Sequence, residues 1–200
     1  KDSKDQATVQ NVMRQALQSD PYGSRQPTIN ATFDLILSQH NNTQVTIDQG
    51  IARQPSEGRL YFLKGMHLLG LEDFRSAVPY FERAAALIPS WARPYYLAGY
   101  CYSRLGDVAQ AQRYLSGSLR INKTHPPSLV ELAVIQNAYY NQYEKAKGYL
   151  RAAFADGDTM APFLESRGRY QLALAEFGLG NKAVAGDEAE KALRFDPLNP

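Results

Sequence analysis

The residues able to do chemistry are few in this sequence, and they lie far apart. Cys101 is the only cysteine among the 200 residues, and it lies between two tyrosines in the stretch LAGYCYSRLGD, 97–107. A nucleophilic thiol needs a base beside it, and this stretch contains no histidine. We therefore interpret Cys101 as a small side chain packed between helices.

The histidines and the acidic pairs form no site either. The three histidines, at 40, 67 and 125, are not arranged at a metal-ligand spacing. Glu72-Asp73 and Asp187-Glu188 fall where turns end and helices begin, and carboxylates there cap free amides and favour the helix dipole. The stretch DGD at 156–158 lacks the later glutamate of a calcium loop. We therefore expect no enzyme, no metal and no cofactor.

Composition excludes several other classes of function. The chain has 22 basic and 20 acidic residues, mixed along its length, for a net charge of +2. It therefore lacks the clustered basic face that nucleic acid or an anionic membrane would require. No apolar run approaches the roughly 20 residues needed to span a bilayer. A hydrophobic content of 44% is enough to build a core.

An internal repeat organises the chain from about residue 58 onward. Its first two copies align with an offset of 34 residues, which places Gly65 on Gly99 and Ala77 on Ala111. In the third copy Ala146 follows Ala111 by 35 residues, and we place Val134 where the glycine would be. A fourth copy, at 167–197, comes after a longer loop.

Each copy is predicted to be a helix–turn–helix. Apolar residues recur at helical spacing, and a turn containing Gly, Asn or Asp separates the two halves, as at Gly106-Asp107. Small residues such as Gly99 and Ala111 let the two antiparallel helices approach closely. An earlier amphipathic helix is expected at 6–18.

The period and the small, aromatic and proline positions resemble those of the tetratricopeptide repeat. The resemblance implies an all-α fold, a right-handed α-solenoid of helix–turn–helix repeats. The expected organisation is an N-terminal helix and linker at 1–26, a degenerate first repeat at 27–57 and four repeats at 58–91, 92–125, 127–160 and 166–199, which form one continuous solenoid to residue 200.

In this family the first helix of each repeat lines a concave groove that usually holds a peptide or a segment of a partner protein. Helical spacing selects an inner stripe that is mostly apolar and aromatic, a composition typical of interaction sites. It also includes Ser103, Glu131, Ala138 and Gln171. The predicted partner-binding residues are Phe62, Leu63, Met66, Arg93, Tyr96, Leu97, Tyr100, Arg104, Ile135, Tyr139, Tyr170, Leu174 and Phe177.

The groove differs from that of the co-chaperones that grip a C-terminal carboxylate, which place Lys, Asn and Arg along this face. We expect no such clamp here, because only Arg59, Arg93 and Arg104 offer cations. Two alternatives to a partner in the groove stay open. The helix at 6–18 or a further C-terminal segment fills it, or the chain is an oligomerisation module of a larger protein.

The stretch LRINKTHPPSLVELAVIQNAYYNQYEKAKGYL, 119–150, is similar to repeats of bacterial tetratricopeptide lipoproteins that help to build pili. These include type IV pilotins and tight-adherence (Flp) pilus proteins. The resemblance implies a periplasmic protein associated with the outer membrane, with a signal and a lipidated cysteine ahead of residue 1. A cytosolic adaptor is the alternative.

Overall fold

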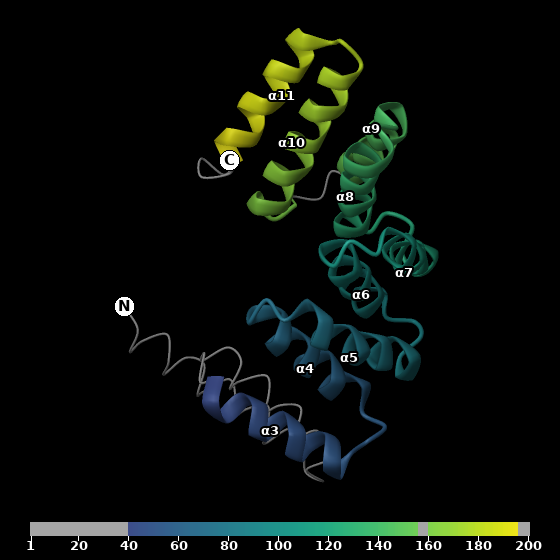
Figure 1. Ribbon diagram of the computed structural model, residues 1–200, viewed down its shortest axis with the longest axis vertical. Coiled ribbons are helices and arrows are strands. Elements are labelled where there is room, and N and C mark those ends of the chain that lie inside the picture. Colours follow the sequence, from purple (N-terminus) through teal and green to yellow (C-terminus); the bar gives the residue numbers. More distant parts are fainter. Residues whose placement is uncertain (1–39, 156–159, 196–200) are drawn as a thin grey trace. The chain divides into compact units, whose positions relative to one another are not determined.

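The computed structural model describes residues 40–155 and 160–195, which form helices and turns (Figure 1). The predicted all-α class is confirmed for these residues. The expected helix at 6–18 and the DGD stretch lie outside them, as does much of the degenerate repeat at 27–57. The chain divides into two compact units, 1–90 and 91–200.

The first unit contains α3 (His40–Arg53), α4 (Gly58–Gly70) and α5 (Phe74–Leu87). Asp73 begins α5, because its side chain accepts a hydrogen bond from the Ser76 amide at 3.1 Å. Between α3 and α4, the Lys64 ammonium lies 2.9 Å from the Asp48 carboxylate.

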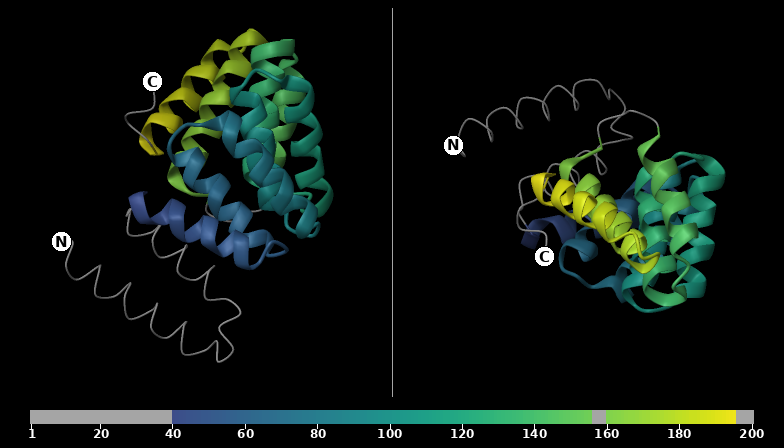
Figure 2. Two further views of the ribbon diagram at one scale, coloured as in Figure 1. Left: turned by 60° about the horizontal axis from the view of Figure 1, so that its bottom comes forward. Right: turned by 90° about the horizontal axis from the view of Figure 1, so that it is seen from above.

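The second unit contains three antiparallel helix pairs (Figure 1), and Figure 2 again shows α10 beside α11. Asp107 caps the second helix of the first pair by accepting from the Gln110 amide at 3.1 Å. The pairs stack in chain order, with α8 against both α6 and α10, as in an α-solenoid. They are α6 (Ala92–Arg104) with α7 (Val108–Ile121), α8 (Pro126–Ile135) and the π-helix η1 (Gln136–Tyr140) with α9 (Tyr143–Phe154), and α10 (Pro162–Gly178) with α11 (Lys182–Phe195).

Close approach of α6 and α7 depends on Gly99. A Cβ atom added to Gly99 would lie 2.8 Å from Cγ of Leu115 and 3.1 Å from its backbone nitrogen. Leu115 is fully buried in the seam of this pair. The role predicted for a small residue at this position is therefore confirmed.

The π-helix explains why the repeat offset changes from 34 to 35. Cys101 and Ile135 are 34 residues apart and both fully buried, whereas the equally buried Ala111 and Ala146 are 35 apart. The extra residue lies between these pairs, and η1 accommodates it by widening one turn. The small position in the third copy is therefore Ala133, which is fully buried, and the assignment to the half-buried Val134 was wrong.

Two glycine-to-alanine substitutions should have opposite effects on the second unit. Gly99→Ala should lower the free energy of unfolding by about 1–3 kcal/mol, because the new methyl group overpacks the seam against Leu115. Gly148→Ala should raise it by about 0.5–1 kcal/mol, because a Cβ on this exposed residue of α9 meets no atom within 4 Å and alanine favours the helix. Urea unfolding followed by circular dichroism measures both. Equal effects of the two changes would contradict the seam assignment.

Candidate functional site

The first helices of the three pairs in the second unit form one face. Glu131 of α8 lies at its centre with only 1% of its surface exposed. Its carboxylate accepts hydrogen bonds from the Ser103 hydroxyl of α6 at 2.8 Å and from the Arg167 guanidinium of α10. A buried carboxylate without partners would be costly, and these two bonds tie three consecutive first helices together.

Aromatic side chains of α6 lie beside this network. The Arg167 guanidinium lies 5.7 Å from the ring centroid of Tyr100, and the Tyr96 and Tyr100 centroids are 6.3 Å apart. Burial, reinforced by the negative charge of Glu131, raises the pKa of Tyr96 well above its usual range. Burial and the nearby Arg93 lower the pKa of His125, whose ring lies 5.4 Å from that of Tyr96. Both side chains are therefore neutral near pH 7.

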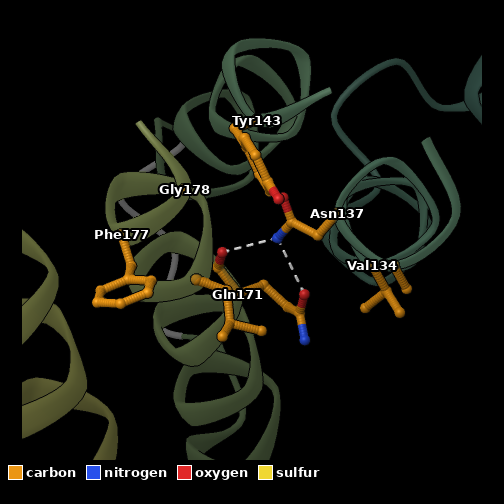
Figure 3. A pocket seen from close by; sticks show the side chains of 8 residues that line it. Val134, Asn137, Tyr143, Gln171, Phe177 and Gly178 are labelled. Atoms are coloured by element: carbon orange, nitrogen blue, oxygen red, sulfur yellow. Dashed lines mark hydrogen bonds between the residues drawn. The ribbon is translucent and has the colours of Figure 1, made fainter. Parts of the chain in front are cut away.

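A cavity of about 250 Å³ opens between α8–η1 and α10 (Figure 3). The amide nitrogen of Asn137 donates to the backbone oxygen of Gln171 at 2.9 Å and to its Oε1 at 3.1 Å. Tyr143 packs closely on Gly178 at one wall, where a Cβ would lie 2.6 Å from the ring. The cavity is lined by Val134, Asn137, Ala138, Tyr143, Gln171, Leu174, Phe177 and Gly178.

Several predicted groove residues of the second unit are accessible where they were expected. Leu174 and Phe177 line the cavity, with exposed fractions of 38% and 63%. Tyr96 and Tyr100 are half-buried. The remaining accessible members are Arg93, Arg104, Tyr139 and Tyr170. Their role in binding a partner stays a prediction.

Four predicted groove residues are buried, and their assignment to an open groove surface was wrong. Ile135 packs with Ala111 and Leu115 in the core of the second unit, and Leu97 is also buried. One residue along a helix turns the side chain by about 100°, because 3.6 residues make one turn. A set of groove residues chosen from helical spacing alone therefore easily includes neighbours that face the core. The four residues are Phe62, Leu63, Leu97 and Ile135.

In the first unit, too, predicted groove residues face the core. The rings of Phe62 and Phe81 are 5.9 Å apart in an edge-to-face arrangement, so Phe62 faces the second helix of its own pair. Leu63 packs with Ile47 and Leu60. Met66 is half-buried and belongs to this unit.

Five residues of the candidate site were missed from the sequence, and two of them, Tyr143 and Gly178, form one wall of the cavity. Val134 had been assigned to the seam, and Arg167 lies at the edge of the fourth copy, so its ion pair with Glu131 is not visible in any repeat pattern. Asn137 lies 34 residues after Ser103, which belongs to the predicted stripe, so the offset between the second and third copies could have found it. Arg167 is a further cation on this face, but Glu131 compensates its charge.

Comparison with known proteins identifies the repeats. Residues 58–90 and 92–125 match the tetratricopeptide repeat family, so the chain carries tetratricopeptide repeats. Such repeats typically form non-catalytic modules for protein–protein interaction. No curated protein sequence matches the chain significantly.

Solved structures share the fold. PilW, described as a widely conserved type IV pilus biogenesis factor, is 22% identical with a TM-score of 0.74, over 98% of this chain and 88% of its own. Pseudomonas aeruginosa pilF is 18% identical with a TM-score of 0.78, over 98% and 86%. A chain of the APC/C hetero-tetramer Cut9–Hcn1 is 16% identical with a TM-score of 0.82. The match covers 96% of this chain but only 37% of the Cut9–Hcn1 chain. None of the described helices is long and apolar enough to cross a membrane.

Removing one member of the buried ion pair should be far more harmful than removing both. Arg167→Met should lower the free energy of unfolding by about 3 kcal/mol, because it leaves the Glu131 carboxylate buried without its cation. The double variant Arg167→Met with Glu131→Leu should recover most of this loss. Urea unfolding of the wild type, both single variants and the double variant measures the coupling. Additive losses would show that the pair does not link the helices.

Cys101 lies in the core, as expected for a packed side chain. It is fully buried, and burial raises its pKa to about 12. A thiol in this state is unreactive near neutral pH because the thiolate is the nucleophile. Ellman's reagent at pH 8 should therefore modify Cys101 only as fast as the protein opens, and urea should accelerate the reaction to the rate of a free thiol. Rapid modification of the native protein would place Cys101 at an accessible site instead.

Proposed function

We propose that this protein is a non-enzymatic scaffold that binds an apolar or aromatic segment of a partner protein on the face of α6, α8 and α10. The observation that carries the proposal is the cavity between α8 and α10, with Leu174 and Phe177 accessible at its wall. Accessible apolar groups gathered around a cavity are typical of binding sites. Aromatic side chains also supply much of the binding energy at interfaces.

We place this activity in the assembly of a bacterial pilus or secretion system. The similarity of 119–150 to repeats of pilus-building lipoproteins supports this, as does the fold shared with the pilus biogenesis factor PilW. The proposal concerns assembly rather than catalysis, since tetratricopeptide repeats typically act as interaction modules. The partner is then a protein of the assembly machinery.

Site-specific photo-cross-linking tests the proposal in the host bacterium. A benzoylphenylalanine at Phe177 should form an adduct with a partner protein, whereas the same residue at Ala109, exposed on α7, should not. Leu174→Ser should reduce the adduct about fivefold or more, because it removes apolar contact area at the site. An equal adduct from Ala109, or one unaffected by Leu174→Ser, would contradict binding at this face.

Serine substitutions at the same positions test the pathway. Leu174→Ser combined with Phe177→Ser should reduce the number of surface pili seen by electron microscopy. Ala109→Ser, on the exposed surface of α7, is the matched control and should leave the number unchanged. Normal piliation in the strain with both serine substitutions would place the partner outside pilus assembly.

A further inference from the structure

The cavity between α8 and α10 has room for one large apolar side chain. Its volume is about 250 Å³, and Val134, Ala138 and Leu174 contribute apolar walls. An apolar cavity of roughly 150 Å³ is enough to hold benzene. The side chain of a phenylalanine, leucine or methionine therefore fits.

Two amide side chains place a hydrogen-bond donor of fixed direction at the cavity. The backbone oxygen of Gln171 can only accept, so it fixes the Asn137 amide with its nitrogen toward α10. That nitrogen also donates to Gln171 Oε1, which leaves Gln171 Nε2 pointing away from Asn137 (Figure 3). Gln171 lines the cavity, and within residues 40–155 and 160–195 its Nε2 donates to no acceptor.

Asn137 carries a second sign of a binding site. Its side chain is only 7% exposed, yet its Oδ1 has no hydrogen-bond partner among the described residues. Native proteins rarely leave a buried polar atom unsatisfied. Asn137 also lies in η1, and single-turn π-helices occur frequently at functional sites.

We propose that this cavity takes an extended segment of the partner, with one apolar side chain inside it and the neighbouring main-chain carbonyl bound to Gln171 Nε2. The inference rests on the proposed function and adds the chemistry of what is bound. The interior of a helix cannot supply this carbonyl, because its carbonyls are already bonded within the helix. The carbonyls of an extended segment are free to accept.

A free carboxylate is a poorer match than a main-chain carbonyl. The donor at the cavity is a neutral amide, whereas carboxylates are bound most strongly by cations such as the arginine fork. Arg167, the cation of the same face, already binds Glu131 and lies over Tyr100. The site therefore recognises an internal stretch of chain through its neutral amide backbone.

Two small probes test the assignment by NMR on the isotopically labelled full chain. N-acetyl-phenylalanine N-methylamide carries one apolar side chain and main-chain amides, and toluene carries only the ring. Both should shift the amide signals of Ala138 and Leu174. Only the blocked phenylalanine brings a carbonyl to Nε2, so it should move the side-chain NH₂ signals of Gln171 further downfield than toluene does.

Substitution of the donor provides the decisive comparison. Gln171→Met removes Nε2 while Asn137 keeps its bond to the backbone oxygen of residue 171. It should weaken binding of the blocked phenylalanine roughly 3- to 10-fold, the usual worth of one net hydrogen bond, and leave toluene binding about unchanged. Gln112→Met, on α7, is the matched control and should affect neither probe.

Equal loss for both probes in Gln171→Met would overturn the inference, as would Gln171 NH₂ signals that do not move in the wild type. The second measurement needs no variant and so does not depend on the variant's stability. Either result would leave the photo-cross-link from Phe177 intact, since that adduct reports a partner at the face whatever its backbone conformation. Loss of the cross-link would instead contradict the proposed function itself.

Discussion

The carboxylate of Glu131 is the constraint around which the second unit is arranged. An ionised carboxylate with 1% exposure is tolerated only where hydrogen bonds and an opposite charge replace water. Ser103 supplies one bond from α6 and Arg167 supplies the charge from α10. The first helices of three successive repeats are thus held in one relative position by a single side chain of the middle helix.

This arrangement also sets the chemistry that the face offers to a partner. Because Arg167 is paired with Glu131 and lies against Tyr100, its charge is compensated within the protein. Tyr96 and His125 are kept neutral by burial and by their charged neighbours. What the cavity presents is apolar walls and the amide of Gln171. Such a surface favours an apolar segment over a charged one.

The π-helix η1 connects the repeat pattern to the cavity. One additional residue in the third repeat is absorbed at the end of α8, which leaves the packing of α9 undisturbed and keeps Ala146 and Leu150 in the core. The wider turn carries Asn137 and Ala138, both of which line the cavity. The additional residue, visible in the sequence only as a change of offset from 34 to 35, is therefore part of the candidate site.

The sequence by itself determined the all-helical class, the repeat period and the helix starts at Asp73 and Asp107, because these depend on local spacing and capping. It also identified Gly99 as a close-approach position and Cys101 as a packed residue. It did not decide which of two neighbouring residues, such as Tyr96 and Leu97, stays accessible, since that depends on how a second helix covers the first. Nor did it reveal the bonds of Glu131 with Arg167 and of Asn137 with Gln171. These pairs lie 36 and 34 residues apart, and only the stacking of α8 against α10 brings them together.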